Sequence, residues 1–258
     1  MIVLSAIPTM LVLLMPCTAC VDQNTSPTTR QEKTVLLEPV ESFRVENSTM
    51  EAALGTLRQT DFARILIGFE KIAHRQGEKV EPLSLSMSNS TVGQILDQLC
   101  EKSGGYTYDI VDSRIIHVYP AHAQSDPVGL LDLKISEFLV EGNMLPAALI
   151  VRIPDLAPEL ASYLGAKKSE YYARHNIARA SPGAIGRGNM DPKVNLHLRN
   201  MTVREILNAI VLYSVQLRNQ TPPDAHGYKL PTASWTYEFV IDPNAPTGLG
   251  GTPRWIAF

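Results

Sequence analysis

The sequence predicts an α+β protein of two tandem modules, each with the order β-α-β-β-α-β-β and with two helices packed between small sheets. The first observation is a repeated sequence motif, called the repeated phrase below, which is clearest at residues 83–96 (LSLSMSNSTVGQIL) and 194–207 (VNLHLRNMTVREIL). The second is that each copy is followed by a similar segment, 106–111 (YTYDIV) and 235–240 (WTYEFV). A phrase that recurs together with its surroundings indicates a duplicated structural unit.

The phrase itself predicts a strand that turns directly into a helix. Apolar residues alternate with serines from Leu83 to Met87, as in a half-buried strand. Thr91, with Gln94 three residues later, predicts a capping box at the helix start. The helix then has an apolar stripe with i, i+3, i+4, i+7 spacing, formed by Val92, Ile95, Leu96 and Leu99.

The second copy repeats each of these features, with Thr202 and Glu205 as the box. A third copy upstream has alternating Phe43 and Val45, and Ser48 with Glu51 as its expected box. A degraded fourth copy begins near Leu131, and its Pro146 is expected in the first helical turn. Asn47, Asn89 and Asn200 match the glycosylation acceptor pattern, but their recurrence at each strand-to-helix junction indicates a structural role.

Each expected helix is followed by strands. Apolar Ile65, Ile67 and Phe69 alternate with other residues after the first helix, which predicts a strand. Residues 106–118 predict a hairpin with its turn at Asp112 and Ser113. Residues 131–258 follow the same order more loosely. The second module is expected to carry insertions at 154–191 and 221–231, and loops of such length are commonly functional.

The N-terminus predicts export from the cytoplasm. Residues 1–15 carry no charge and are nearly all apolar, and small residues follow. A segment this short suits a signal peptide better than a membrane-spanning helix. We therefore expect a signal over residues 1–20, a flexible tether over 21–38, and modules over 39–122 and 128–258.

Two forms of cleavage fit residues 17–20 (CTAC). The small residues suit ordinary signal peptidase, which gives a soluble periplasmic protein. The same residues partly match a bacterial lipobox, in which Cys20 would be lipidated and would anchor the protein to a membrane. Both forms place the protein in a Gram-negative-type envelope. Cys100 is expected to be a small buried apolar residue.

The strand, the Asn-x-Thr junction, the Ile-Leu stripe and the Gly-x-Tyr hairpin resemble the secretin and TonB N-terminus short domain. The resemblance is clearest over residues 82–119 and patchy over 131–258. It implies two helices held between two small sheets, a periplasmic location, and a docking role towards another envelope protein. The shared motif is structural, so it implies the fold more strongly than the function.

No catalytic, cofactor or metal motif is visible in the sequence. The six histidines are scattered, and His117 and His197 are expected to face solvent. The net charge of −3 gives the whole chain no electrostatic reason to bind nucleic acid. A non-enzymatic docking protein is therefore the first hypothesis. The alternative is an enzyme or ligand-binding protein with its site in the second module's insertions, around Tyr171, Tyr172, His175 and His226.

One segment of the first insertion combines basic residues with tyrosines, which are typical anchors of protein interfaces. A solvated helix face is the simpler interpretation of this segment. Its candidate partner-binding residues are Lys167, Lys168, Tyr171, Tyr172, Arg174 and Arg179.

Overall fold

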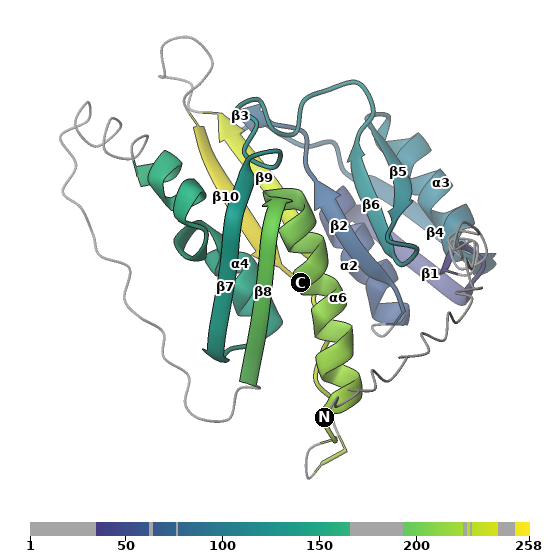
Figure 1. Ribbon diagram of the computed structural model, residues 1–258. Helices are drawn as coiled ribbons and strands as arrows, with labels where there is room; N and C mark the ends of the chain where they lie inside the picture. Colours follow the sequence, from purple (N-terminus) through teal and green to yellow (C-terminus); the bar gives the residue numbers. More distant parts are fainter. Residues whose placement is uncertain are drawn as a thin grey trace, which may run out of the picture.

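The computed structural model describes residues 35–61, 64–75, 77–165, 193–223, 226–227, 229–241 and 251–258. It confirms the α+β class (Figure 1). The elements of the first half are β1 Pro39–Ser48, α2 Met50–Thr60, β2 Leu66–Glu70, β3 His74–Arg75, β4 Leu83–Thr91, α3 Val92–Ser103, β5 Tyr106–Val111 and β6 Ile115–Pro120. Those of the second half are β7 Lys134–Asn143, α4 Pro146–Leu156, β8 Lys193–Thr202, α6 Val203–Gln220, β9 Trp235–Ile241 and β10 Gly251–Ala257.

The strands form one larger sheet and two antiparallel ribbons. The ribbons are β1 with β4 and β7 with β8, one from each half. The larger sheet has the order β10-β9-β2-β6-β5, with β3 beside β9. Its central strand β2 pairs in parallel with β6 of its own half and with β9 of the other half. The two halves therefore share a continuous sheet.

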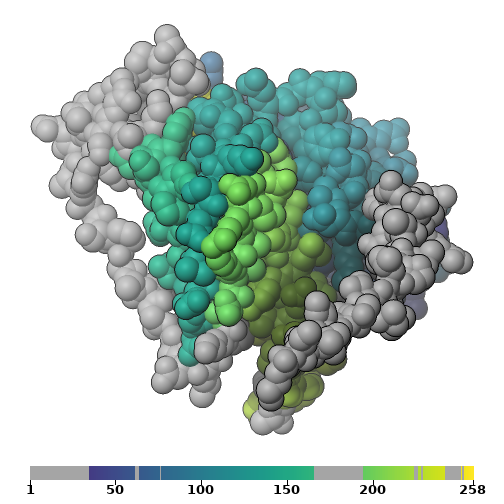
Figure 2. Space-filling model, viewed as in Figure 1, coloured from purple at the N-terminus to yellow at the C-terminus, as the bar shows by residue number. Residues whose placement is uncertain are grey.

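The two halves pack against opposite faces of this sheet. Side chains alternate between the faces of a strand. In β2, Ile67 and Phe69 join the apolar core of the first half, whereas Leu66 joins that of the second. Figure 1 shows α6 in front of the larger sheet and α3 behind it. All five residues of β2 are buried, and in the space-filling view α6 covers the middle of the molecule from this side (Figure 2).

The strand-to-helix junctions form as the sequence predicts at two of the copies. Thr91 and Thr202 each N-cap a helix through a complete capping box with Gln94 and Glu205 respectively. The predicted box at Ser48 is wrong, because the helix begins one residue later. Thr49 caps α2 there by accepting a hydrogen bond from the Ala52 N–H at 3.2 Å.

The asparagine of each junction adopts the left-handed conformation, which asparagine tolerates better than most residues. The φ angles are 51° at Asn47, 49° at Asn89 and 53° at Asn200. Each asparagine stands two residues before the capping threonine, so it turns the strand towards the helix. A backbone requirement therefore explains the recurrence of this residue.

The two ribbons have matching contacts. Val40, Phe43 and Val45 of β1 are buried, and β7 buries Ile135, Phe138 and Val140 at the same relative positions. At the start of α3, the Val92 N–H donates to the Glu38 carbonyl at 3.0 Å. At the start of α6, the Val203 N–H donates to the Leu133 carbonyl at 3.1 Å.

The second half differs from the first after α4. Pro146 lies in the first turn of α4, as predicted. Among the described residues no strand stands between α4 and β8, and the chain is instead helical again over 158–165. Leu160 and Leu164 of this segment are buried in the core of the second half. The beginning of the expected insertion 154–191 is therefore part of the folded body rather than a loop. Within the described ranges, no helix combines the length and apolarity needed to cross a membrane.

Candidate functional site

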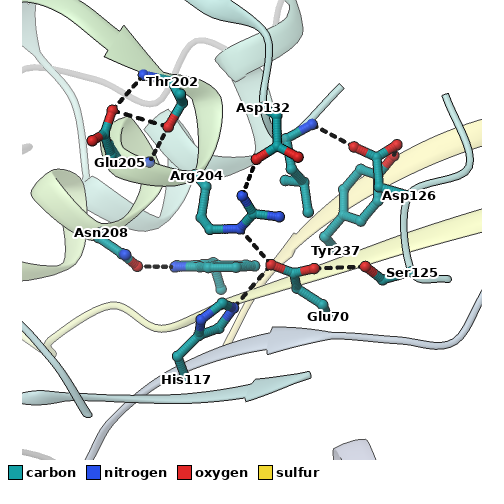
Figure 3. A network of polar contacts seen from close by, with 12 residues as sticks. Glu70, His117, Ser125, Asp126, Asp132, Thr202, Arg204, Glu205, Asn208 and Tyr237 are labelled. Carbon is teal, nitrogen blue, oxygen red and sulfur yellow. Dashed lines mark hydrogen bonds and ion pairs between the residues drawn. The ribbon is translucent and has the colours of Figure 1, made fainter. Parts of the chain in front are cut away.

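A buried carboxylate lies where the two halves meet. Glu70, at the end of β2, is only 3% exposed. Its Oε1 accepts a hydrogen bond from Arg204 Nε at 2.6 Å and lies 2.9 Å from His117 Nε2 (Figure 3). Its Oε2 accepts from Ser125 Oγ at 2.6 Å. These partners come from α6, from β6 and from the connecting segment between β6 and β7, so one carboxylate contacts three parts of the chain.

The hydrogen bonds keep Glu70 ionised. Burial alone would raise the pKa of a carboxyl group. Here the hydrogen bonds from His117, Arg204 and Ser125 outweigh burial and lower the pKa of Glu70 to about 2. Arg204 also pairs with Asp132. Burial would lower the pKa of Arg204, but the hydrogen bonds and charges of Glu70 and Asp132 raise it. The carboxylate is therefore charged near neutral pH and interacts with three polar side chains.

Trp235 of β9 packs directly beside this cluster. Its indole Nε1 donates to Asn208 Oδ1 of α6 at 2.9 Å, and both residues are buried. The ring lies against Gly68 of β2, where an added Cβ would come within 2.7 Å of two indole carbons. Glycine at 68 is therefore what allows β2 and the tryptophan to approach so closely.

Tyr237, two residues further along β9, is also held by the connecting segment. Its hydroxyl donates to Asp126 Oδ1 at 3.0 Å, and Asp126 Oδ2 accepts from the Leu131 N–H. Burial and the nearby Asp126 raise the pKa of Tyr237 well above its usual range. The tyrosine therefore stays neutral and acts as a hydrogen-bond donor.

A second ionic cluster lies on the other face of the sheet. Glu238 of β9 is 7% exposed and accepts from Lys71 Nζ at 2.6 Å. Lys71 also pairs with Glu51 of α2 at 3.2 Å, while His74 and Arg254 lie 3.5 Å from the Glu238 carboxylate. Burial would raise the pKa of Glu238, but Lys71, followed by His74 and Arg254, lowers it. This cluster also joins the two halves.

A third link runs from α2 to the segment before β9. Arg58 is 4% exposed, and its Nη2 donates to the Thr232 carbonyl and to Thr232 Oγ1. Its guanidinium carbon lies 5.8 Å from the ring centre of Phe258. Burial lowers the pKa of Arg58 to about 10, so the side chain remains charged at neutral pH.

The geometry of the Glu70 cluster favours a structural role over catalysis. A serine nucleophile needs a base that can accept its proton. Ser125 donates to Glu70, which is a weak base because its pKa is about 2. In the described parts of the chain, no group of three or more His, Cys, Asp or Glu side chains is placed to hold a metal ion. The cluster can hold the two halves in a fixed relation.

Most residues that the sequence singled out fall outside the residues that the structure describes. This holds for Cys20, for Tyr171, Tyr172 and His175 of the enzyme alternative, and for the whole candidate partner-binding set. His226 is described and lies exposed in a turn. The candidate partner-binding residues outside the described part of the chain are Lys167, Lys168, Tyr171, Tyr172, Arg174 and Arg179.

The expectation for His117 is wrong. His117 is 8% exposed and its Nε2 contacts the Glu70 carboxylate. The centres of its ring and of the Trp235 ring are 5.7 Å apart. Its strand has a second buried face because the other half covers it. His197 is indeed largely accessible, and its Nε2 lies 2.8 Å from Glu137 on the outer face of the second ribbon.

Sequence reasoning missed the residues that join the halves, although a signal for them is present. Glu70 and Glu238 interrupt apolar strands, and a buried charge needs a partner. Gly68 within the first of these strands also signals a close backbone approach. Cys100, which the sequence predicts to be buried, is only partly buried. Its burial, followed by the charge of Asp97, raises the pKa of its thiol to about 11.

Comparison with known proteins adds no relative: no protein-family model, curated protein or solved structure matches the chain.

Proposed function

We propose that this protein is a non-enzymatic docking module of a Gram-negative-type cell envelope. In this proposal residues 1–20 are an export signal, and the mature protein is either soluble in the periplasm or anchored by a lipid on Cys20. The two halves are copies of one module similar to the secretin and TonB N-terminus short domain. The partner is another envelope protein, and neither nucleic acid nor a cofactor takes part.

One observation carries the proposal. The larger sheet is fixed in its middle and open at its β5 end. In the middle, Glu70 and Glu238 bind cations from the opposite half on the two faces of the sheet. At the end, no described strand pairs with the outer edge of β5. A rigid body with an unpaired strand edge suits protein binding, because main-chain groups at the edge can pair with another chain.

The matching contacts of the two ribbons support the duplication. The capping boxes, the left-handed asparagines and the bonds of Val92 and Val203 recur at corresponding positions. These contacts follow from the repeated sequence motif and are structural rather than catalytic. They therefore favour a module whose role depends on its shape.

Cross-linking in intact envelopes tests the proposed function. The full chain, with an affinity tag after Phe258, is cross-linked in cells of the source organism and purified under denaturing conditions. We expect one reproducible envelope partner in near-stoichiometric amount. Recovery of no partner above the level of an unrelated exported protein would reject the docking function.

A matched pair of variants tests the candidate partner-binding residues. Alanine at Lys167, Lys168, Tyr171, Tyr172, Arg174 and Arg179 is expected to lower the partner yield. Alanine at the exposed Glu78 and Lys79 is the control and is expected to leave the yield unchanged. Equal yields from both variants would show that the candidate segment does not bind the partner. Mass spectrometry of the mature N-terminus distinguishes a lipidated Cys20 from ordinary cleavage.

A further inference from the structure

The outer edge of β5 pairs with no other described strand. β5 pairs with β6 on one side and ends the larger sheet (Figure 1). The Ala121 N–H donates to the Gly105 carbonyl at 2.9 Å, which places Gly105 towards β6. Backbone groups alternate along an antiparallel pair. The N–H and C=O groups of Tyr106, Tyr108 and Ile110 therefore point outward, and none of these residues is a proline.

The protein itself shows how such an edge is filled. In the repeat, β9 corresponds to β5, since WTYEFV matches YTYDIV. The Phe258 N–H donates to the Ser234 carbonyl at 3.2 Å, which corresponds to the bond between Ala121 and Gly105. The outer edge of β9 is covered by β2, which runs parallel to it with Gly68 opposite Trp235 and Glu70 opposite Tyr237. A parallel strand from another part of the chain thus occupies the edge that is open in β5.

One backbone hydrogen bond shows which residues of β2 turn their N–H and C=O groups towards β9. The Lys71 N–H donates to the Tyr237 carbonyl at 2.9 Å. The residues of the added strand that face β9 are therefore Phe69 and Lys71, while Gly68 and Glu70 face the other way. A strand added to β5 in the same way would bond the backbone of Tyr108, the counterpart of Tyr237.

The opposite end of the sheet is protected against strand addition. The hydrogen bonds between Phe258 and Ser234 show that the backbone groups of the even-numbered residues of β10 point towards β9. Those of Pro253 therefore point to the outer edge. Proline has no N–H to donate, and natural proteins use it to blunt exposed edges. The two ends of the larger sheet therefore differ among the described strands: β5 presents an uninterrupted row of donors, whereas Pro253 interrupts that of β10.

The surroundings of β5 are acidic. Asp97 of α3 accepts from the Tyr108 hydroxyl at 2.8 Å, which holds this carboxylate beside the strand. The Asp109 side chain, on β5 itself, is 56% exposed. Asp112 follows in the hairpin turn and is exposed, with Arg114 two residues later. Charges of one sign around an interface attract a partner of the opposite sign.

We propose that β5 binds one extended segment of a partner protein as a parallel strand, and that this segment carries Lys or Arg residues. The inference rests on the proposed docking function and adds the surface and the chemistry of the partner. The backbone of the partner segment pairs with β5 as β2 pairs with β9. Asp97, Asp109 and Asp112 attract the basic side chains of the segment.

A labelled peptide tests the inference directly on the full chain. The probe has the sequence of residues 64–73 with Glu70→Lys, and binding is followed by fluorescence anisotropy. The peptide is expected to bind about tenfold tighter than the unmodified 64–73 sequence at low salt, and to lose most of that advantage near 0.5 M salt, where the screening length is only about 4 Å. Hydrogen exchange is expected to slow at the amides of Tyr106, Tyr108 and Ile110.

Two N-methylated peptides form the matched control. Methyl groups at the positions of Phe69 and Lys71 remove donors that face β5 and are expected to weaken binding about tenfold or more. Methyl groups at the positions of Gly68 and Glu70 face away and are expected to leave binding nearly unchanged. Equal binding of the two peptides, or unchanged exchange at the β5 amides under saturation, would overturn the inference.

Protein variants check the charge argument without touching the peptide. Asp109→Asn with Asp112→Asn is expected to remove the advantage of the basic peptide, whereas Glu141→Asn on the exposed face of β7 is not. An equal effect of both changes would reject the acidic surface as the selector. If the peptide does not bind but the cross-linking experiment still yields a partner, the β5 inference is wrong and the docking function stands. If both experiments fail, both proposals are wrong.

Discussion

Replacing Glu70 by glutamine is expected to destabilise the folded protein by about 3 kcal/mol at pH 7. Glutamine keeps the size of the side chain but removes the charge that faces Arg204. The pKa of Glu70 is about 2 in the fold, against an ordinary value of 4.5. Each pKa unit corresponds to about 1.4 kcal/mol of preference for the ionised form. Since Glu70 is only 3% exposed, solvent screening reduces this figure little.

The contribution of Glu70 must disappear in acid. The pKa of Glu70 is lowered in the fold, so the unfolded chain binds more protons between about pH 4.5 and pH 2. The stabilisation is therefore complete above about pH 5 and is lost as the pH falls through that window. It is expected to shrink to roughly 1.5 kcal/mol at pH 3. The stability curves of the wild-type protein and of Glu70→Gln should converge towards low pH.

Urea unfolding at pH 7, 5 and 3 measures both quantities. The control is Glu46→Gln, because Glu46 is exposed and pairs with Arg44 at the surface. We expect this control to stay within about 0.5 kcal/mol of the wild type. A loss below 1 kcal/mol for Glu70→Gln at pH 7, or a gap between the two proteins that does not narrow by pH 3, would refute the argument.

Two further predictions concern the backbone of the shared sheet and the helix starts. Gly68→Ala is expected to cost about 1–3 kcal/mol in urea unfolding, since its Cβ would overlap the Trp235 ring. Gly55→Ala in α2 has open space around it and is expected to stabilise by about 0.5–1 kcal/mol, and the reverse order would contradict the packing argument. Thr91→Ala and Thr202→Ala are each expected to cost about 1 kcal/mol, with Thr→Ser restoring most of it.

The local parts of the fold follow from the sequence because their causes are local. The capping boxes at Thr91 and Thr202 and the turn into each helix depend on residues within three positions of each other. The third copy shows the limit of this reasoning. Ser48 and Thr49 are adjacent and both are good caps, and the position of the helix start decides between them.

The site depends on contacts that a local pattern cannot predict. His117 alternates with apolar residues on β6, and this pattern normally gives a solvent-facing side chain. That inference assumes a sheet with one covered face. The larger sheet has both faces covered, because α6 of the second half packs where solvent was expected. The charges of Glu70 and Glu238 within apolar strands are the sequence features consistent with this second cover.

The shared strand explains why the polar residues gather where they do. β2 lies between β6 of its own half and β9 of the other half, so the two halves meet along its edge with β9. A buried charge is tolerated when a partner of opposite sign lies beside it, and removing one partner costs several kcal/mol. Glu70 therefore requires Arg204 from the second half, and Glu238 requires Lys71 from the first. Each half supplies the counter-ion of the other, and a separated first half would leave Glu70 without Arg204 and one edge of β2 without its strand. The two halves are thus joined by one sheet and by ion pairs across it, and among the described strands β5 ends that sheet with no strand on its outer side.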